Sequence, residues 1–298
     1  MSQMLQDEPE LISLPFPATQ TIRASARSLI SLFGVHVDNI DMRAALDLLE
    51  QAISGPRTSS KGIYFVNAST LNLASEHPEY RELLNRGFRV FGDGTGVRWA
   101  ARWQGKPMKA NLNGTDLVPE LFERTAGQGY RYYLLGATDE TIQRAAANAQ
   151  RRFPGWNLVG WHHGYVDAQS SPQVIEQINA AQPHLLLVGM GNPLQENWID
   201  RYLPELDVPL CMGTGGLFDH WAGNLRRASR LVRYAGYEWL QLLLQQPHKW
   251  RRYLLGNPLF LWRMVKYGAA DQAETVRLAQ DCVAEAALAA GHDAVQAH

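Results

Sequence analysis

Short apolar runs alternate along most of the chain with stretches in which apolar residues recur every three or four positions. The runs predict buried strands, and the periodic stretches predict helices with one face on a core. We expect strands over residues 32–37, 63–66, 89–91, 130–135, 157–161, 185–189 and 208–212. We expect helices after the N-cap candidate Asp41 and over residues 70–86, 94–104, 116–127, 138–152, 172–182 and 194–203. This alternation predicts an α/β fold with Rossmann-like parallel sheets flanked by helices.

The character of the sequence changes toward both ends. Residues 1–32 are polar and weakly patterned, and we interpret them as a flexible tail before an α/β catalytic core over residues 33–223. Residues 224–268 predict a basic, aromatic, helical appendage, and residues 269–298 predict an Ala-rich helix or tail. The first thirty residues lack the pattern of a signal peptide. The sequence has no run of about 18 apolar residues, so we expect no membrane-spanning helix.

Three glycine-rich segments directly follow predicted strands. They are residues 91–96, 188–196 and 213–219, and each combines glycines with one or two polar side chains. In an α/β protein, the loops at the carboxyl ends of parallel strands build the ligand site. We therefore expect one composite site, to which Asn67 and Asp116 add further polar loop ends.

Asp93 is the leading candidate for chemistry in that site. Its small neighbours, Gly92 and Gly94, let a ligand approach the backbone, and the N-terminus of the next helix offers N–H groups to a phosphate. A carboxylate in this position can act as a general base toward an alcohol. Judged from position alone, Asp93 is equally suited to cap that helix.

Gln195 and Glu196 fall in the first turn of a helix that Pro193 can open. For Glu196, a favourable interaction with the helix dipole is the preferred interpretation. Gln195 is uncharged, and an amide in that position suits hydrogen bonding to a sugar hydroxyl or a phosphate. In the third segment, Asp219 is a candidate for hydrogen bonding to a ribose diol.

Composition argues against several other classes. The net charge is −1, with 46% hydrophobic and 19% charged residues, so we expect no nucleic-acid partner. Two cysteines, Cys211 and Cys282, are too few for a disulfide framework. His162 and His163 lack a third ligand at metal spacing, and no two aspartates lie two residues apart, so we expect no metal.

A basic and aromatic segment follows the predicted core. Between Leu225 and Tyr267 the chain has nine Lys or Arg residues and one acid, Glu238, with aromatic residues interleaved. Such a segment suits an anionic membrane surface, at about 1 kcal/mol for each cation near it. A solvated helical hairpin that covers the core is the alternative.

With these segments in this order, the chain resembles the WecG/TagA/CpsF glycosyltransferases, glycosyltransferase family 26. The resemblance runs from Phe33 to Phe260. It rests on Asn67 after its strand and on residues 93–96, 114–117, 134–136, 164–165, 189–199, 215–223, 227–228, 238–240 and 251–253.

The resemblance implies an inverting, metal-independent transferase that needs no cofactor and moves a sugar from a UDP-sugar to a polyprenyl-diphosphate-linked saccharide. It implies that the catalytic residues are Asp93, as the general base, and Gln195, as an amide near the transferred sugar, and that Asn67 is a substrate-binding residue of the sugar site. The other substrate-binding candidates are Gly94, Gly96, Asn111, Asn113, Asp116, Gly136, Gly189, Gly191, Glu196, Gly215, Gly216, Asp219, Arg227, Arg251 and Arg252.

The C-terminal segment resembles the membrane-targeting appendage of that family, from which Arg251 and Arg252 are expected to complete the site over the diphosphate. The expected location is cytoplasmic, peripheral at the inner face of the plasma membrane. Phe65 stands where many members have Thr, Asn111 where many have Arg, and Ser229 where Pro is usual. The first two bear on the donor, which stays open between a hexose such as glucose, as in exopolysaccharide synthesis, and N-acetylmannosamine or its uronic acid.

Two other classes stay open. An NAD(P)-binding Rossmann oxidoreductase would need a third glycine at position 97 or 99, where Val97 and Trp99 stand. A non-catalytic assembly protein at the membrane surface would bind vesicles without transferring a sugar. The sequence also leaves open whether the chain forms a homo-oligomer.

Overall fold

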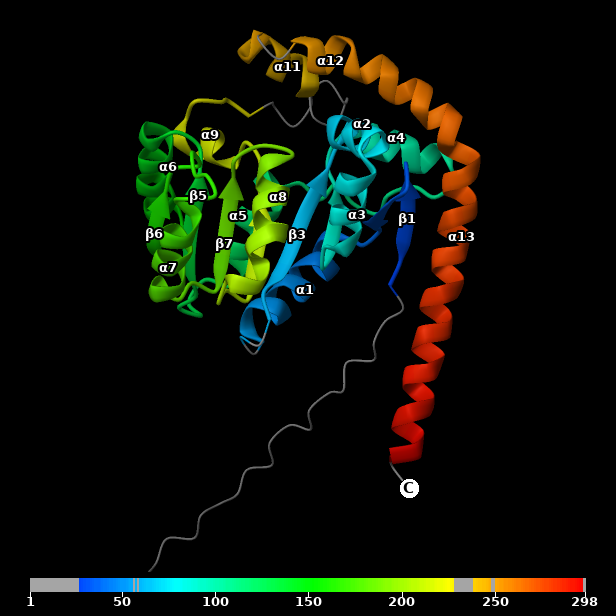
Figure 1. The fold of residues 1–298 in the computed structure, drawn as a ribbon, viewed down its shortest axis with the longest axis horizontal. Coiled ribbons are helices and arrows are strands. Elements are labelled where there is room, and N and C mark those ends of the chain that lie inside the picture. The colour runs from blue at the N-terminus through cyan, green and yellow to red at the C-terminus, as the bar shows by residue number, and fades with distance from the viewer. Residues whose placement is uncertain (1–26, 56, 58, 228–237, 248–249, 297–298) are drawn as a thin grey trace, which may run out of the picture.

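The computed structural model describes residues 27–55, 57, 59–227, 238–247 and 250–296 (Figure 1). Most of the predicted N-terminal tail, residues 1–26, lies outside the described residues. The strands are β1 (Leu29–Leu32), β2 (Val35–Asp38), β3 (Lys61–Val66), β4 (Arg89–Gly92), β5 (Arg131–Gly136), β6 (Asn157–His162), β7 (Leu185–Gly189) and β8 (Leu210–Gly213). They form one eight-stranded sheet in the order β1-β2-β4-β3-β8-β7-β5-β6. Neighbouring strands are parallel except β1 and β2, which form an antiparallel hairpin at one edge.

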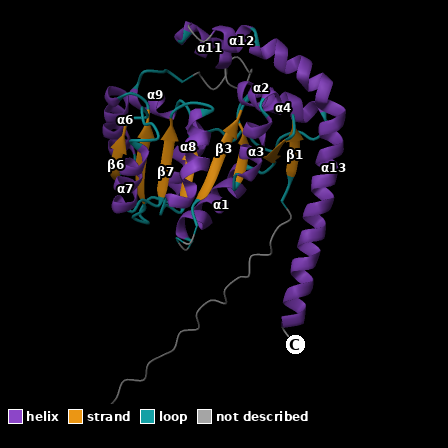
Figure 2. Cartoon of the chain, viewed as in Figure 1, coloured by secondary structure: helices purple, strands orange, loops and turns teal. Residues whose placement is uncertain are grey.

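Helices cover both faces of this sheet (Figure 2). One face carries α1 (Met42–Ser54), α5 (Gly114–Arg124), α6 (Asp139–Arg152) and α9 (Leu217–Ala222). The other carries α2 (Ala68–Glu76), α3 (Pro78–Arg86), α4 (Thr95–Trp103), α7 (Ser171–Ala181), α8 (Leu194–Tyr202) and α13 (Gly256–Gln296). The remaining described helices are the short η1 (Leu203–Glu205), α11 (Glu238–Gln245) and α12 (Trp250–Leu254).

The strand residues show why this arrangement follows from the sequence. Along β7, Leu185 and Leu187 pack in one core cluster, whereas Leu186 and Val188 pack in the cluster on the opposite face. Successive side chains of a strand point to opposite faces, so a strand covered on both sides needs a nearly continuous apolar run. The structure confirms the predicted α/β class with its mostly parallel sheet.

The single strand predicted over residues 32–37 is wrong. The chain turns there, at Phe33 and Gly34, which have φ of 54° and 76°, and the two flanking segments pair as β1 and β2. A two-residue turn with both φ values positive matches the twist of an antiparallel hairpin. Residues 29–32, assigned to the tail from sequence, therefore lie in the sheet.

The single helix predicted over residues 70–86 is also wrong, because it is two helices, α2 and α3. The break falls at His77, which has φ −122° and ψ 95° and precedes Pro78. Proline lacks an N–H and disfavours helical geometry in the residue before it. The dipeptide therefore marks the end of one helix and the first turn of the next.

The C-terminal helix α13 runs through the boundary expected at residue 268. It packs against β1, α2 and α4 along one side of the body (Figure 1). Asp271, in the part predicted as Ala-rich helix or tail, accepts hydrogen bonds from Ser31 Oγ at 3.1 Å, from the N–H of Phe33 at 2.8 Å and from the N–H of Gly34 at 3.0 Å. The helix thus supplies the acceptor for the β1–β2 turn.

Replacing Asp271 with Ala should destabilise the chain by about 2–4 kcal/mol, because two backbone N–H groups and a hydroxyl lose their acceptor in a buried place. The free energy of unfolding from a denaturant titration measures this loss. Asp281→Ala, at an exposed position of the same helix, is the matched control and should change stability little. Equal effects of the two substitutions would contradict the role given to Asp271.

Candidate active site

The polar loop ends that the sequence predicts to meet lie together at the carboxyl ends of the parallel strands, and we call this side of the sheet its carboxyl edge. Asn67 follows β3, Asp93 follows β4, Gly189 ends β7 and Gly213 ends β8. These four strands are consecutive neighbours in the order β4-β3-β8-β7, and they run parallel. The arrowheads of β3 and β7 point to this edge, on the side where α11 and α12 lie (Figure 2).

Asp93 lies on a short loop between β4 and α4. Its backbone N–H donates to the carbonyl oxygen of Val66 at 2.8 Å, which ties the loop to the end of β3. The next residue, Gly94, has φ 89°, a conformation that L side chains rarely adopt, and it is the N-cap of α4. The N–H of Gly94 donates to Oδ1 of Asn111 at 2.7 Å. The half-buried Asp93 is therefore held at the sheet edge, and Asn111 supports the loop that carries it.

The first turns of α2 and α4 pack together beside this loop. A Cβ at Gly96 would lie 3.0 Å from Cβ of Ala68 and 3.4 Å from the ring of Phe260 on α13, so a side chain there would press on both helices. Asn67 is the N-cap of α2, and its Oδ1 accepts a hydrogen bond from the N–H of Ser69 at 3.0 Å. Asn67 thus shapes the edge next to Asp93, and its contact with a sugar stays a prediction.

Gln195 lies beneath the loops rather than on their surface. Its side chain is 1% exposed. Its Oε1 accepts hydrogen bonds from the N–H of Gly191 at 3.2 Å and from the N–H of Gly215 at 3.0 Å. One buried amide therefore joins the loop after β7 to the loop after β8. This geometry supports a positioning role, whereas the sequence suggested a direct contact with the transferred sugar.

Glu196 is fully buried next to Gln195. Its Oε1 accepts hydrogen bonds from Nε2 of Gln195 at 2.7 Å and from Nδ2 of Asn192 at 2.6 Å, and its Oε2 accepts one from the hydroxyl of Tyr80 at 3.1 Å. Burial outweighs these hydrogen bonds and raises the pKa of the Glu196 carboxyl from 4.5 to about 7. The carboxyl of Glu196 links α3 to α8. The sequence suggested only an interaction with the helix dipole, whereas the structure shows three hydrogen bonds to specific side chains.

Glycines at the last positions of β5 and β7 allow the strand ends to approach closely. A Cβ at Gly136 would lie 2.4 Å from the carbonyl oxygen of Gly189, and a Cβ at Gly189 would lie 2.7 Å from the ring of Phe218. No larger residue fits at either position without moving backbone or an aromatic ring. Gly191, Gly215 and Gly216 complete the loops after β7 and β8. These glycines therefore define the shape of the edge.

A second polar group lies at the N-terminus of α5. Asn113 caps this helix, and its Oδ1 accepts from the N–H of Asp116 at 2.9 Å. Arg227 forms an ion pair with Asp116, with Nη2 and Oδ2 2.6 Å apart, and donates from Nη1 to the carbonyl oxygen of Thr115 at 2.9 Å. Arg227 thus holds the chain after α9 against α5, and its contact with substrate stays a prediction.

The remaining candidates come from α9 and α12. Oδ1 of Asp219 accepts a hydrogen bond from Nδ2 of Asn224 at 3.2 Å. The exposed Arg251 lies over the ring of Trp250, with its guanidinium carbon 5.5 Å from the ring centre. The side chain of Arg252 and all of residues 228–237 lie outside the described residues. Contacts of Arg251 and Arg252 over a diphosphate therefore stay predictions.

Sequence reasoning missed two residues that shape the site. Tyr80 comes from α3, far along the chain from its partner Glu196, and no local pattern indicates that contact. Asn192 stands inside the glycine-rich segment after β7 but was not singled out, although its amide donates to Glu196. A polar residue four positions before a carboxyl indicates a hydrogen bond between the two, but only once that carboxyl is known to be buried.

Comparisons with known proteins show which family the sequence matches. The sequence model of the glycosyl transferase WecG/TagA/CpsF family matches residues 30–274. The chain is 29% identical over 239 residues to an N-acetylglucosaminyldiphosphoundecaprenol N-acetyl-beta-D-mannosaminyltransferase of Staphylococcus aureus strain MW2, and the alignment covers 80% of this chain and 92% of the relative. The protein of the same name from strain NCTC 8325 / PS 47 has the same identity and coverage.

The chain therefore belongs to the WecG/TagA/CpsF family of glycosyltransferases. This placement favours a transferase over the oxidoreductase alternative. Within the described part of the chain, no helix is both long and apolar enough to cross a membrane. The same described residues contain no group of three or more His, Cys, Asp or Glu side chains that could hold a metal ion.

Replacing Glu196 with Gln should make the chain's stability less dependent on pH. The folded-state pKa of about 7 lies above 4.5, so the carboxyl's contribution to stability is complete below about pH 4.5 and is lost as the pH rises through about 7. The Gln side chain keeps the shape and cannot ionise. The stability of Glu196→Gln relative to the parent should therefore rise, by on the order of 3 kcal/mol, between about pH 5 and about pH 8.

Denaturant titrations of both proteins at several pH values measure this difference. Glu120→Gln, at an exposed position of α5, is the control and should show a difference that changes little with pH. A difference for Glu196→Gln that is constant over the same range would show that the buried carboxyl does not titrate there.

Proposed function

We propose that this chain transfers a sugar from a UDP-sugar to a saccharide linked to polyprenyl diphosphate, with inversion at the anomeric carbon. The observation that carries the proposal is the position of Asp93, half-buried at the end of β4 and next in space to the α2 cap Asn67. The names of the Staphylococcus aureus relatives, which include a diphosphoundecaprenol acceptor, support the acceptor class.

In the proposed reaction, the carboxylate of Asp93 takes the proton of the acceptor hydroxyl. The acceptor oxygen forms its bond to the anomeric carbon while the bond from that carbon to the UDP oxygen breaks. UDP leaves with the electron pair, and because attack and departure occur on opposite faces, the configuration inverts. The buried Gln195 acts as a positioning residue, since it holds the loops after β7 and β8 in one arrangement.

The negative charge of the phosphates needs a positive counterpart. The N-terminus of α4, with the N–H groups of its first turn at Thr95 and Gly96, offers one. Arg251 and Arg252 of α12 are the proposed further donors, and Asp219 is the proposed partner of the ribose. In this proposal the reaction needs no metal ion, because helix N–H groups and arginines stabilise the departing diphosphate.

The donor sugar is proposed as either an N-acetylated hexosamine or a plain hexose. The relatives are named for an N-acetylmannosaminyl group, which favours the first. Of the three positions that differ from the family pattern, the two that bear on the donor have structural roles here: Phe65 is buried, with its ring 5.9 Å from that of Phe91, and Asn111 supports Gly94. A comparison of UDP-N-acetylmannosamine with UDP-glucose as donors decides between them.

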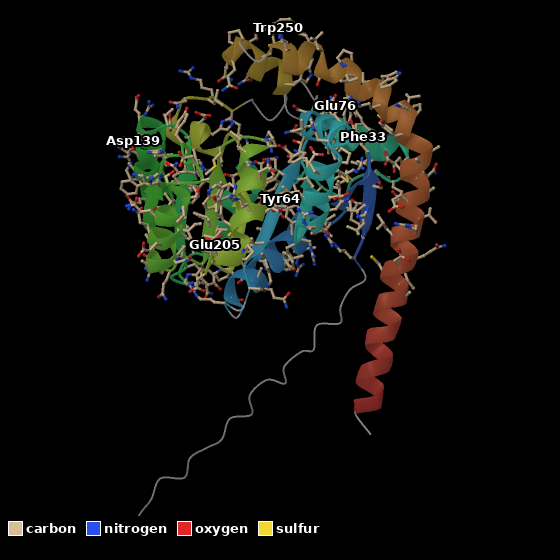
Figure 3. The ribbon with its side chains drawn as sticks, viewed as in Figure 1. Phe33, Tyr64, Glu76, Asp139, Glu205 and Trp250 are labelled. Atoms are coloured by element: carbon tan, nitrogen blue, oxygen red, sulfur yellow. The ribbon has the colours of Figure 1, made fainter. Side chains whose placement is uncertain are left out.

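We further propose that the chain works as a peripheral protein at the inner face of the plasma membrane, in the synthesis of a surface polysaccharide. The C-terminal elements support this location, because α11 exposes Leu240 and Leu244, and α12 exposes Trp250 and Leu254. Figure 3 shows Trp250 on the outer side of α11 and α12, the helices that lie beyond the carboxyl ends of the parallel strands. Exposed apolar side chains among cations suit a lipid headgroup region.

Replacing Asp93 with Asn should lower turnover with donor and lipid-linked acceptor by about 10²–10⁴-fold, because the amide cannot accept the proton. Isothermal titration should show unchanged UDP binding, since the substitution keeps the size of the side chain. The assay includes EDTA, in which the parent chain should keep its turnover.

Asp139→Asn is the matched control. Asp139 is exposed in the first turn of α6, on the far side of the body from α13 (Figure 3), and its replacement should leave turnover unchanged. Turnover of Asp93→Asn near that of the parent would refute the role of Asp93 as the base. Loss of UDP binding in Asp93→Asn would instead place Asp93 in nucleotide binding.

A further inference from the structure

Helix α4 exposes two tryptophans although it belongs to the catalytic core. Trp99 is 53% exposed and Trp103 is 60% exposed, and their spacing of four residues places them on one face of the helix. The opposite face, with Val97, Ala100 and Ala101, is buried. Two large aromatic side chains on one exposed face indicate a surface that contacts something else.

Helix α13 runs alongside α4 over about two turns. Near the start of α4, Gly96 lies against Phe260, and at its end Trp103 lies against Gly268, where a Cβ would be 3.1 Å from Nε1 of the indole. The two contacts are seven residues apart on α4 and eight apart on α13, which corresponds to about 10–12 Å along each helix. The two helices therefore run roughly parallel, and α13 continues the exposed face of α4.

Three exposed apolar residues of α13 extend this face. Leu261 and Val265 lie seven and three positions before Gly268, so they share the stripe of α13 that meets Trp103. Trp262 follows Leu261 and is 56% exposed, and Val265 is 61% exposed. We call the surface made by these three residues and the two tryptophans of α4 the α4–α13 surface.

The charged residues of α4 and of the part of α13 beside it are basic, and Glu76 of α2, an acid next to this part of α13, is ion-paired with Arg263. Arg98, Arg102, Lys106 and Lys109 lie in α4 or directly after it, and the sequence has no Asp or Glu from residue 94 to 115 or from residue 239 to 270. On α13, Nζ of Lys266 lies 4.9 Å from the ring centre of Trp262. Cations around exposed tryptophans complement anionic lipid headgroups, where an indole ring keeps its apolar body in lipid and its N–H in the interface.

We propose that the α4–α13 surface lies on an anionic lipid bilayer, so that the core contacts the membrane directly through α4. The inference deepens the proposed function and rests on it, because a lipid-linked acceptor presents its saccharide at that surface. Since α4 begins directly after Gly94, and Trp99 lies about 6 Å along the helix from Thr95, docking of the tryptophans sets the height of the Asp93 loop above the headgroups.

Vesicle flotation with the full chain tests this surface. We expect the parent to float with phosphatidylcholine vesicles that contain phosphatidylglycerol and to bind pure phosphatidylcholine much more weakly. The double variant Trp99→Ser/Trp103→Ser should lose about tenfold or more of that binding. Trp161→Ser is the control, because Trp161 is also exposed but lies on β6, at the opposite edge of the sheet from β1, and it should bind like the parent.

A second variant, Arg102→Gln/Lys109→Gln, removes two exposed cations and keeps the apolar residues of the surface, and it should also weaken binding to the anionic vesicles. Thermal unfolding checks that each variant is folded. Unchanged binding of both folded double variants, or equal binding of the parent to neutral vesicles, would overturn the proposal. So would a tryptophan variant that turns a dimer into a monomer in sedimentation but keeps vesicle binding, because the surface would then join two copies.

Activity separates this inference from the proposed function. With a short-chain acceptor in solution, Trp99→Ser/Trp103→Ser should match the parent, and with the acceptor in anionic vesicles its turnover should fall by about the same factor as its binding. If the parent binds vesicles through this surface but transfers no sugar, the proposed function fails and the membrane contact stands. If the parent transfers sugar and the variant does so equally well in vesicles, the contact fails and the proposed function stands.

Discussion

The buried amide of Gln195 is the contact on which the shape of the candidate site depends. Its oxygen holds the loops after β7 and β8 together, and its nitrogen donates to Glu196. Glu196 in turn joins Asn192 and Tyr80, so that α3 and α8 belong to the same network. A buried polar network with its partners in place is rigid, and removing one member leaves others without a partner. The edge of the sheet is therefore formed before any ligand arrives.

Much of this could be predicted from the sequence. The apolar runs indicated six of the eight strands, β3 to β8, and the glycine-rich segments indicated the edge at which Asp93 and Asn67 meet. Both are local signals, since strand ends and turns are encoded by neighbouring residues. The Phe33-Gly34 turn and the His77-Pro78 break were also local signals, but the apolar periodicity on either side concealed them.

The roles of individual side chains were harder to predict. Gln195 stands in the first turn of a helix, and only the three-dimensional packing shows that the turn faces inward rather than toward a ligand. Asp271 stands in an Ala-rich stretch with no local sign of a partner, and its three hydrogen bonds reach a turn nearly the whole chain away. Contacts of this kind depend on topology, which a single sequence does not reveal. They also show that α13 is part of the folded body, so that its exposed face keeps a fixed position relative to Asp93.

A crystal structure of the chain with UDP bound is the most direct test of the catalytic assignment. We expect the uridine diphosphate to lie across the loops after β7 and β8, in contact with the glycines there and with Asp219. The carboxylate of Asp93 should then face the open space next to the terminal phosphate, where a sugar and an acceptor hydroxyl would meet. A nucleotide bound away from this edge, or Asp93 turned toward the core in that complex, would contradict the assignment.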